Sequence, residues 1–140
     1  MSTAPLNCFT TNLDVRWSDQ DVNGHVNNAN AVTLLEEARV RASMHWSGSA
    51  PGKNNPRVVR AINVVFDAEL AHAQPLSANI WVSRIGGTSF TIQHELIQND
   101  TVCVTAEAVI VVLDRDTRKP AAIPDLLRTQ LSDYYAPASV

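Results

Sequence analysis

The segment from residue 28 to residue 46 most constrains the fold of this chain, because its apolar residues spread over much of a helix surface. These residues are Ala29, Val32, Leu35, Ala38, Val40, Ala42, Met44 and Trp46. A helix with one narrow apolar stripe packs on a single neighbour, whereas a broad apolar surface needs cover on several sides. The sequence therefore predicts a long helix that a sheet wraps around.

Strand-like patterns flank this helix. Residues 13–17 alternate between apolar and polar side chains, which is the period of a half-buried strand. Beyond the long loop 47–57, four further runs rich in strand-forming residues follow at 58–69, 76–85, 88–98 and 102–113. Short turns separate the last three runs, so we expect those three to form a meander of antiparallel hairpins.

The predicted order is one strand, a loop, a long helix and four antiparallel strands, which is an α+β layout with one helix against one sheet. The 140 residues suit a single domain, 1–140, and leave no room for a separate cofactor domain. Pro124 and the leucine spacing after it indicate a short terminal helix.

Composition excludes several function classes. The net charge is −3 and the 11 Lys and Arg residues are scattered, so no nucleic-acid surface is indicated. Cys8 and Cys103 lie far apart without a C-x-x-C partner, which disfavours a disulfide framework and a thiolate zinc site. His45, His72 and His94 are isolated in the sequence, so we expect no metal cluster. The residues MSTAPLNCFTTN show no basic start followed by an apolar run, so we expect no signal peptide, and the sequence contains no run of 18 apolar residues. We expect a cytoplasmic protein without a membrane partner or cofactor.

The loop ahead of the helix carries the candidate chemistry. Asp21 precedes the expected helix start by a few residues. A carboxylate can act as a base or a nucleophile, and the first N–H groups of a helix lack internal partners and carry partial positive charge. This combination suits attack on a carbonyl whose oxygen becomes negative. From the residues alone, a role as a turn or capping residue is the favoured explanation of Asp21.

The same loop also matches the opening of an EF-hand calcium loop, with Asp19, Asp21, Asn23 and Gly24 at the required spacing. The twelfth position, where a bidentate Glu should close the cage, is Asn30. The residues before Asp19 alternate like a strand rather than forming the entering helix. Calcium binding is therefore disfavoured.

A family resemblance rests on residues 16–28, Arg-Trp-x-Asp-x-Asp-x-x-Gly-His-Val-Asn-Asn, followed by Leu-Glu-Glu-Ala-Arg at 35–39. It continues through Gly86-x-x-Ser89 and a late Ile123-Pro124. This pattern resembles the hotdog-fold acyl-CoA thioesterases of the hydroxybenzoyl-CoA thioesterase type. The resemblance implies a five-stranded antiparallel sheet wrapped around a long central helix, an acyl-CoA substrate, and a homodimer or homotetramer with its sites between subunits.

The resemblance also implies residue roles. Asp21 would be the nucleophile or general base, with Asp19 supporting it, and the backbone N–H of Asn28 would polarise the thioester carbonyl. Candidate substrate-binding residues are Gly24, His25, Val26 and Asn27 in the loop, and Arg84, Gly87, Thr88 and Ser89 near the pantetheine of coenzyme A. Arg84, Arg60 and Lys53 are candidates for holding the phosphates of that polyanionic ligand.

One departure from the family pattern affects the expected activity. Related sequences place an aromatic residue shortly after the Asn-Asn pair, whereas this chain has Ala29, Asn30 and Ala31 there. Smaller side chains either reshape the acyl pocket or mark a member with altered or lost activity. Two alternatives therefore stay open, a thioesterase acting on acyl carrier protein and a non-catalytic acyl-CoA-binding protein.

Overall fold

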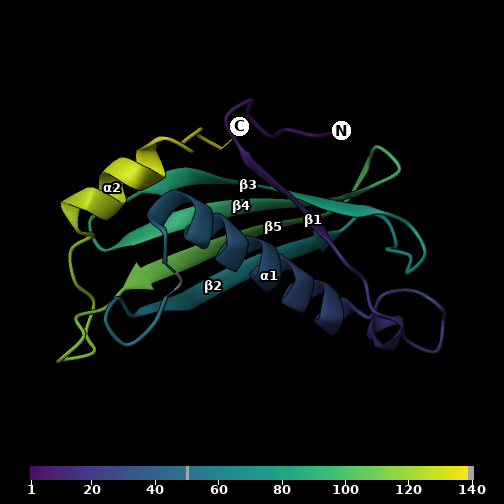
Figure 1. Ribbon diagram of the computed structural model, residues 1–140, viewed down its shortest axis with the longest axis horizontal. Coiled ribbons are helices and arrows are strands. Elements are labelled where there is room, and N and C mark those ends of the chain that lie inside the picture. Colours follow the sequence, from purple (N-terminus) through teal and green to yellow (C-terminus); the bar gives the residue numbers. More distant parts are fainter. Residues whose placement is uncertain (50, 139–140) are drawn as a thin grey trace.

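The structure is a computed structural model that describes residues 1–49 and 51–138. Its main elements are β1 (Phe9–Leu13), α1 (Asn28–Ser47), β2 (Arg57–Phe66), β3 (Leu76–Ile85), β4 (Ser89–Gln98), β5 (Thr101–Val112) and α2 (Asp125–Ser132). The strands form one antiparallel sheet in the order β1-β3-β4-β5-β2 (Figure 1). The α+β class and the five-stranded antiparallel sheet packed against a helix are confirmed.

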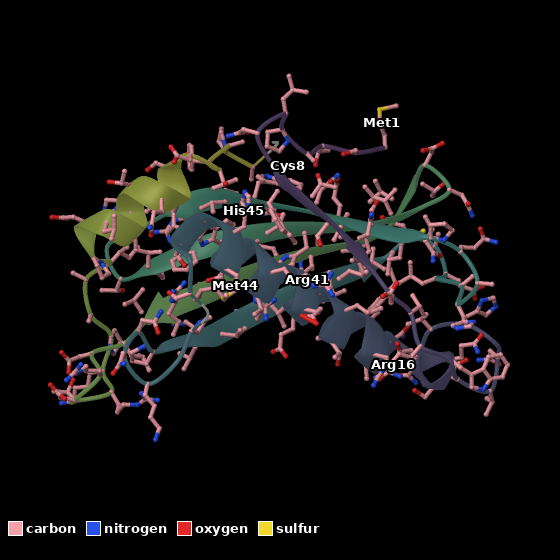
Figure 2. All side chains as sticks on the ribbon, viewed as in Figure 1. Met1, Cys8, Arg16, Arg41, Met44 and His45 are labelled. Atoms are coloured by element: carbon pink, nitrogen blue, oxygen red, sulfur yellow. The ribbon has the colours of Figure 1, made fainter. Side chains whose placement is uncertain are left out.

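Helix α1 crosses one face of the sheet, and the core lies between them (Figure 1). Leu35, Ala38 and Ala42 are fully buried on the helix side, and they pack in the same cluster as alternate residues of β3, β4 and β5. Arg41, Met44 and His45 mark an exposed side of the helix (Figure 2). The helix has 20 residues and ends where Gly48 adopts a left-handed φ of 73°, a conformation that glycine tolerates best.

The predicted position of the first strand is wrong. The alternation at residues 13–17 predicts a strand there, but β1 spans Phe9–Leu13 and a short 3-10 turn follows at Trp17–Asp19. Trp17 is 75 % exposed, so the alternation does not mark a buried face. A local contact overrides the pattern, because the backbone N–H of Arg16 donates to the Asp19 carboxylate at 2.8 Å and bends the chain.

The other elements lie close to their predicted ranges, with one early ending. The strand expected at 58–69 stops at Phe66, because the backbone N–H groups of Asp67 and Ala68 both donate to the carbonyl of Cys103 and turn the chain away from the sheet. This bend begins a connection, residues 67–75, that reaches the Asp21 loop. Among the described residues, no helix is long and apolar enough to span a bilayer.

Candidate active site

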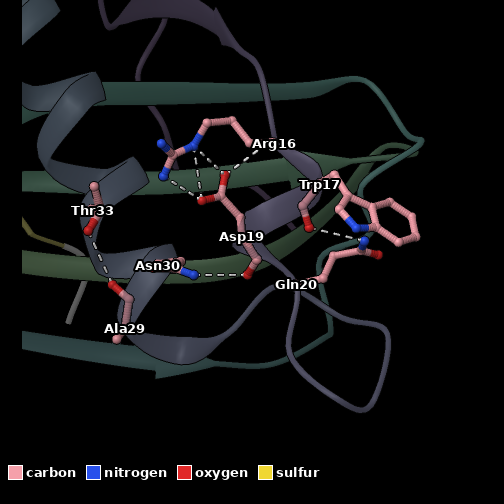
Figure 3. Close-up of polar contacts among 7 residues, drawn as sticks. All are labelled: Arg16, Trp17, Asp19, Gln20, Ala29, Asn30 and Thr33. Atoms are coloured by element: carbon pink, nitrogen blue, oxygen red, sulfur yellow. Dashed lines mark hydrogen bonds and ion pairs between the residues drawn. The ribbon is translucent and has the colours of Figure 1, made fainter.

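The base of the Asp21 loop is fixed by Asp19, which is only 3 % exposed. Its carboxylate accepts hydrogen bonds from the Arg16 backbone at 2.8 Å and from the Arg16 guanidinium at 2.9 Å (Figure 3). Its carbonyl accepts from the backbone N–H of Asn27 at 2.8 Å and from the Asn30 side chain at 3.1 Å. Hydrogen bonding to Arg16 holds the pKa of Asp19 below its ordinary value. Asp19 therefore joins the loop to the start of α1.

Asp21 lies at the turn of the loop. Its backbone N–H donates to the carbonyl of His25 at 2.8 Å, and its carbonyl accepts from Gly24 at 3.1 Å. One carboxylate oxygen accepts the backbone N–H of Asn23 at 2.8 Å, which is an Asx turn. Gly24 has a φ of 80°, and a Cβ there would meet nothing within 4 Å. The glycine thus serves the backbone conformation of this turn rather than close packing.

The start of α1 presents an unused donor. Asn27 caps the helix, since its side chain accepts from the N–H of Ala29 and its carbonyl accepts from the N–H of Ala31. The backbone N–H of Asn28, the first helical residue, has no acceptor among the described residues. An N–H at this position carries part of the positive end of the helix dipole.

A pocket of about 320 Å³ collects these groups. From the loop and the helix start it is lined by Asp21, Asn23, His25, Val26, Asn28 and Ala31. Its opposite wall is the end of β2 and the following connection, with Phe66, Asp67, Ala68, Glu69 and Leu70, together with Val104 of β5. The volume lies at the lower end of the usual range for small-molecule sites.

Two contacts hold the walls of this pocket together. The backbone N–H of Val26 donates to the carbonyl of Leu70 at 3.0 Å. The imidazole Nε2 of His25 lies 2.9 Å from a carboxylate oxygen of Glu69 at the exposed rim. Val26 is itself buried in the core, so the loop is fixed to the sheet as well as to α1.

The structure separates the predicted residues into two groups. Asp21, His25, Val26 and Asn28 line the pocket, whereas Gly24 and Asn27 shape the loop without lining it. Arg84, Thr88 and Ser89 lie with Arg60 in another depression, of about 590 Å³, which Val58 and Val109 also line. Gly87 is not among its lining residues and instead accepts a hydrogen bond from the backbone of Ile123. Lys53 lies in a third depression with Arg118.

The pocket and the Arg84 depression are lined by different parts of β2. Phe66, at the end of β2, lines the pocket, while Val58, near the start of the same strand, lines the depression. Ala61, the lining residue of the depression that is nearest to Phe66 along β2, lies five residues away, which is about 16 Å at about 3.3 Å per residue. Within one chain they therefore do not form a single site.

The pocket wall formed by residues 66–70 was not predicted from the sequence. Those residues read as the tail of a strand, and no local pattern links them to Asp21, since the hydrogen bond from Val26 to Leu70 spans more than 40 positions. The acidic pair Asp67 and Glu69, so close to each other in sequence, was the available signal. Among the described residues, no group of three or more His, Cys, Asp or Glu side chains is placed to hold a metal ion.

Chemically, the pocket offers a carboxylate acceptor, that of Asp21, and an N–H donor at the helix start, that of Asn28, on its loop and helix wall. Such a pair can hold a carbonyl group with its oxygen towards the helix start and its carbon towards Asp21. A family model described as the thioesterase-like superfamily matches residues 15–131, which include both groups. The chain belongs to the thioesterase-like superfamily.

This superfamily member is also similar to individual proteins. It is 29 % identical to the structure of a predicted thioesterase from Bacillus stearothermophilus, with a TM-score of 0.87, covering 94 % of this chain and 99 % of that one. It is 24 % identical to the uncharacterised protein YsmA of Bacillus subtilis, over 84 % of this chain and 80 % of YsmA. A Thermus thermophilus thioesterase described in complex with coenzyme A and Zn is 23 % identical, with a TM-score of 0.77, covering 89 % of this chain and 91 % of that one, and it shows the shared fold.

Proposed function

We propose that this chain is an acyl-CoA thioesterase that hydrolyses an acyl-CoA to a free acid and coenzyme A. The observation that carries the proposal is the pocket in which the Asp21 carboxylate and the N–H of Asn28 at the start of α1 occur together. In this interpretation the sheet wraps around α1 as the long central helix of a hotdog domain. The Thermus thermophilus protein, described with bound coenzyme A, supports the choice of carrier because it shares the fold.

The N–H of Asn28 would donate a hydrogen bond to the carbonyl oxygen of the thioester and stabilise that oxygen as negative charge develops. In one route, an Asp21 oxygen bonds to the carbonyl carbon, the C–S bond breaks, and the thiolate takes a proton from solvent. Water then hydrolyses the mixed anhydride and regenerates Asp21. In the other route, Asp21 takes a proton from water while the oxygen of that water bonds to the carbon, and the proton passes to the leaving thiolate.

The residues near coenzyme A would come from a second copy of the chain. β2 is an edge strand with exposed apolar side chains, namely Val58, Val59, Ile62, Val65 and Phe66, each between 39 % and 46 % exposed. A two-fold axis perpendicular to the sheet pairs such a strand with itself antiparallel, which covers the edge. The Phe66 end of one strand then meets the start of its partner. This brings the Asp21 pocket near the depression of Arg60, Arg84, Thr88 and Ser89 on the other protomer.

The second candidate function is that of a binding protein without turnover, and one feature of the pocket lining favours it. Ala31 lines the pocket in the segment where the resemblance expects an aromatic side chain. A binding protein would show a ligand-dependent rise in melting temperature without release of thiol. A thioesterase that acts on acyl carrier protein would instead show turnover, but only with acyl groups delivered by that carrier.

The test is thiol release from short, long and aromatic acyl-CoAs and from matched acyl carrier protein substrates. Turnover of at least one acyl-CoA is the expected result. Turnover only with carrier protein would reassign the carrier. Stabilisation by acyl-CoA without any thiol, in a folded sample, would assign the binding role and overturn the proposed catalysis.

A further inference from the structure

A second cavity lies beneath the C-terminal half of α1, and it shares no lining residue with the Asp21 pocket. Its volume is about 40 Å³. Its polar lining consists of Arg39, Ser43 and Trp46 from α1 and Arg57 from the first position of β2. Exposed Pro51 and half-buried Arg57 both line it, so the cavity reaches the surface.

The donors around this cavity are poorly satisfied. The Nη1 atom of Arg57 has one recorded acceptor, the Ser43 hydroxyl oxygen, at a long 3.4 Å. The Nη1 atom of Arg39 lies 3.2 Å from a neutral histidine ring, that of His94. The indole Nε1 of Trp46 is buried and has no hydrogen-bond partner among the described residues. Buried polar groups are almost always paired, so an unpaired donor beside two guanidinium groups indicates a missing acceptor.

Charge points the same way. Arg39 has one carboxylate near it, that of solvent-exposed Glu36 at 3.9 Å, and no carboxylate in the described part of the chain forms an ion pair with Arg57. Burial removes both arginine side chains partly from water and thereby lowers their pKa. Two cations that line one cavity both lose hydration, and an anion between them would offset that cost.

The rest of the lining strengthens such an interaction. Phe90 and Ile92 of β4 and Ile110 of β5 form the floor, and all three are buried. Charge-assisted hydrogen bonds gain strength where water is excluded. The cavity is therefore a cationic site with apolar walls rather than a solvated basic surface.

We propose that this cavity binds the carboxylate group of a small acid, held by Arg39 and Arg57 and by the indole N–H of Trp46. The cavity has room for a small group, because one water needs about 10–15 Å³ and the cavity measures about 40 Å³. The rest of the acid would lie at the opening beside exposed Pro51. The forked guanidinium matches the two oxygens of a carboxylate. Inorganic phosphate carries four oxygens on a tetrahedral centre, so it needs more of this space than the planar carboxylate group does.

The bound carboxylate would join the C-terminal half of α1 to the start of β2. Ser43 and Arg57 already make the direct contact there at 3.4 Å, and an anion on the same guanidinium would reinforce it. The site does not depend on the proposed hydrolysis, since none of its residues lines the Asp21 pocket. Ligand binding should raise the melting temperature by mass action.

Acetate is the probe for the test, because it is the carboxylate group with one methyl. The indole N–H resonance of Trp46 is followed by nitrogen-15 NMR during titration at constant ionic strength, with sodium chloride as the salt control and inorganic phosphate as the larger anion. Trp46→Phe assigns the resonance. We expect a saturable shift with acetate in the millimolar range, consistent with a ligand of four heavy atoms, and none with phosphate.

Two variants complete the test. Arg57→Met keeps the length of the side chain without its charge and should weaken acetate binding about tenfold or more, whereas Arg115→Met, on an exposed loop away from the cavity, should leave the titration unchanged. No acetate shift beyond that of chloride, an equal response to phosphate, or full binding in Arg57→Met would each overturn the proposal. Circular dichroism confirms that each variant is folded before it is compared.

Discussion

His94 should make the stability of this protein depend on pH in a way that can be calculated. The ring is 1 % exposed, with Nδ1 at 3.2 Å from the carbonyl of Ala106 and Nε2 at 3.2 Å from Nη1 of Arg39. Arginine only donates hydrogen bonds, so Nε2 accepts and the single ring proton lies on Nδ1, where it donates to the Ala106 carbonyl. The arrangement requires a neutral imidazole.

Burial, assisted by the charge of Arg39, lowers the pKa of His94 from 6.5 to about 3. The folded pKa lies below the unfolded one, so between these values the unfolded chain binds a proton that the folded chain excludes. Stability is therefore complete above pH 6.5 and decreases as the pH falls towards 3. The loss is about 1.4 kcal/mol per pH unit, which gives about 2 kcal/mol at about pH 5 relative to neutral pH.

Urea unfolding at about pH 7.5 and about pH 5 measures this effect, with His94→Gln as the comparison and one protein concentration throughout. Glutamine does not titrate, yet its amide can accept from Arg39 and donate to the carbonyl of Ala106. Carboxylates elsewhere contribute to both proteins and cancel in the difference. We expect the pH-dependent loss to be about 2 kcal/mol smaller in His94→Gln. An equal loss in both proteins would refute the assignment of a neutral, buried imidazole.

Three further predictions concern the dimer, the pocket and the helix start. Val65→Lys places a charge on the β2 edge and should convert the proposed dimer to a monomer in light scattering, whereas Leu6→Lys, on a more exposed N-terminal residue, should not; a dimer that survives the first change contradicts the β2 pairing. Ala31→Leu narrows the pocket and should lower kcat/KM for long acyl groups more than for short ones, so parallel losses would exclude Ala31 from the acyl wall. Asn27→Ala removes the helix cap and should lower the free energy of unfolding by about 1 kcal/mol in urea melts; an unchanged value would contradict the capping role.

The sequence predicts the elements of this fold well because most of them follow from local patterns. The helix expected at residues 28–46 is α1, Asn28–Ser47, since an asparagine cap precedes its apolar residues and a glycine follows them. The strand predicted at residues 76–85 has the same bounds as β3, Leu76–Ile85. The first strand fails where a side chain competes with the backbone pattern, because Asp19 captures the N–H of Arg16.

The candidate site is only half predictable for a related reason. Asp21 and Asn28 lie within one loop and the helix that follows, so their proximity can be expected from sequence. Glu69 and Leu70 reach the same pocket through long-range contacts that no spacing reveals. The cavity lined by Arg39 and Arg57 could not be predicted from the sequence either, because in the sequence the two arginines are ordinary polar positions of a helix and a strand.

The most direct test of the central claim compares wild type, Asp21→Asn and Asp14→Asn in thiol release from the best acyl-CoA substrate. Asp14 is an exposed carboxylate in the same region of the chain but outside the pocket, so it controls for loss of charge. The account predicts that Asp21→Asn lowers kcat by about a hundredfold or more, that acyl-CoA still raises its melting temperature, and that Asp14→Asn matches wild type. Turnover by Asp21→Asn at the wild-type rate would contradict it.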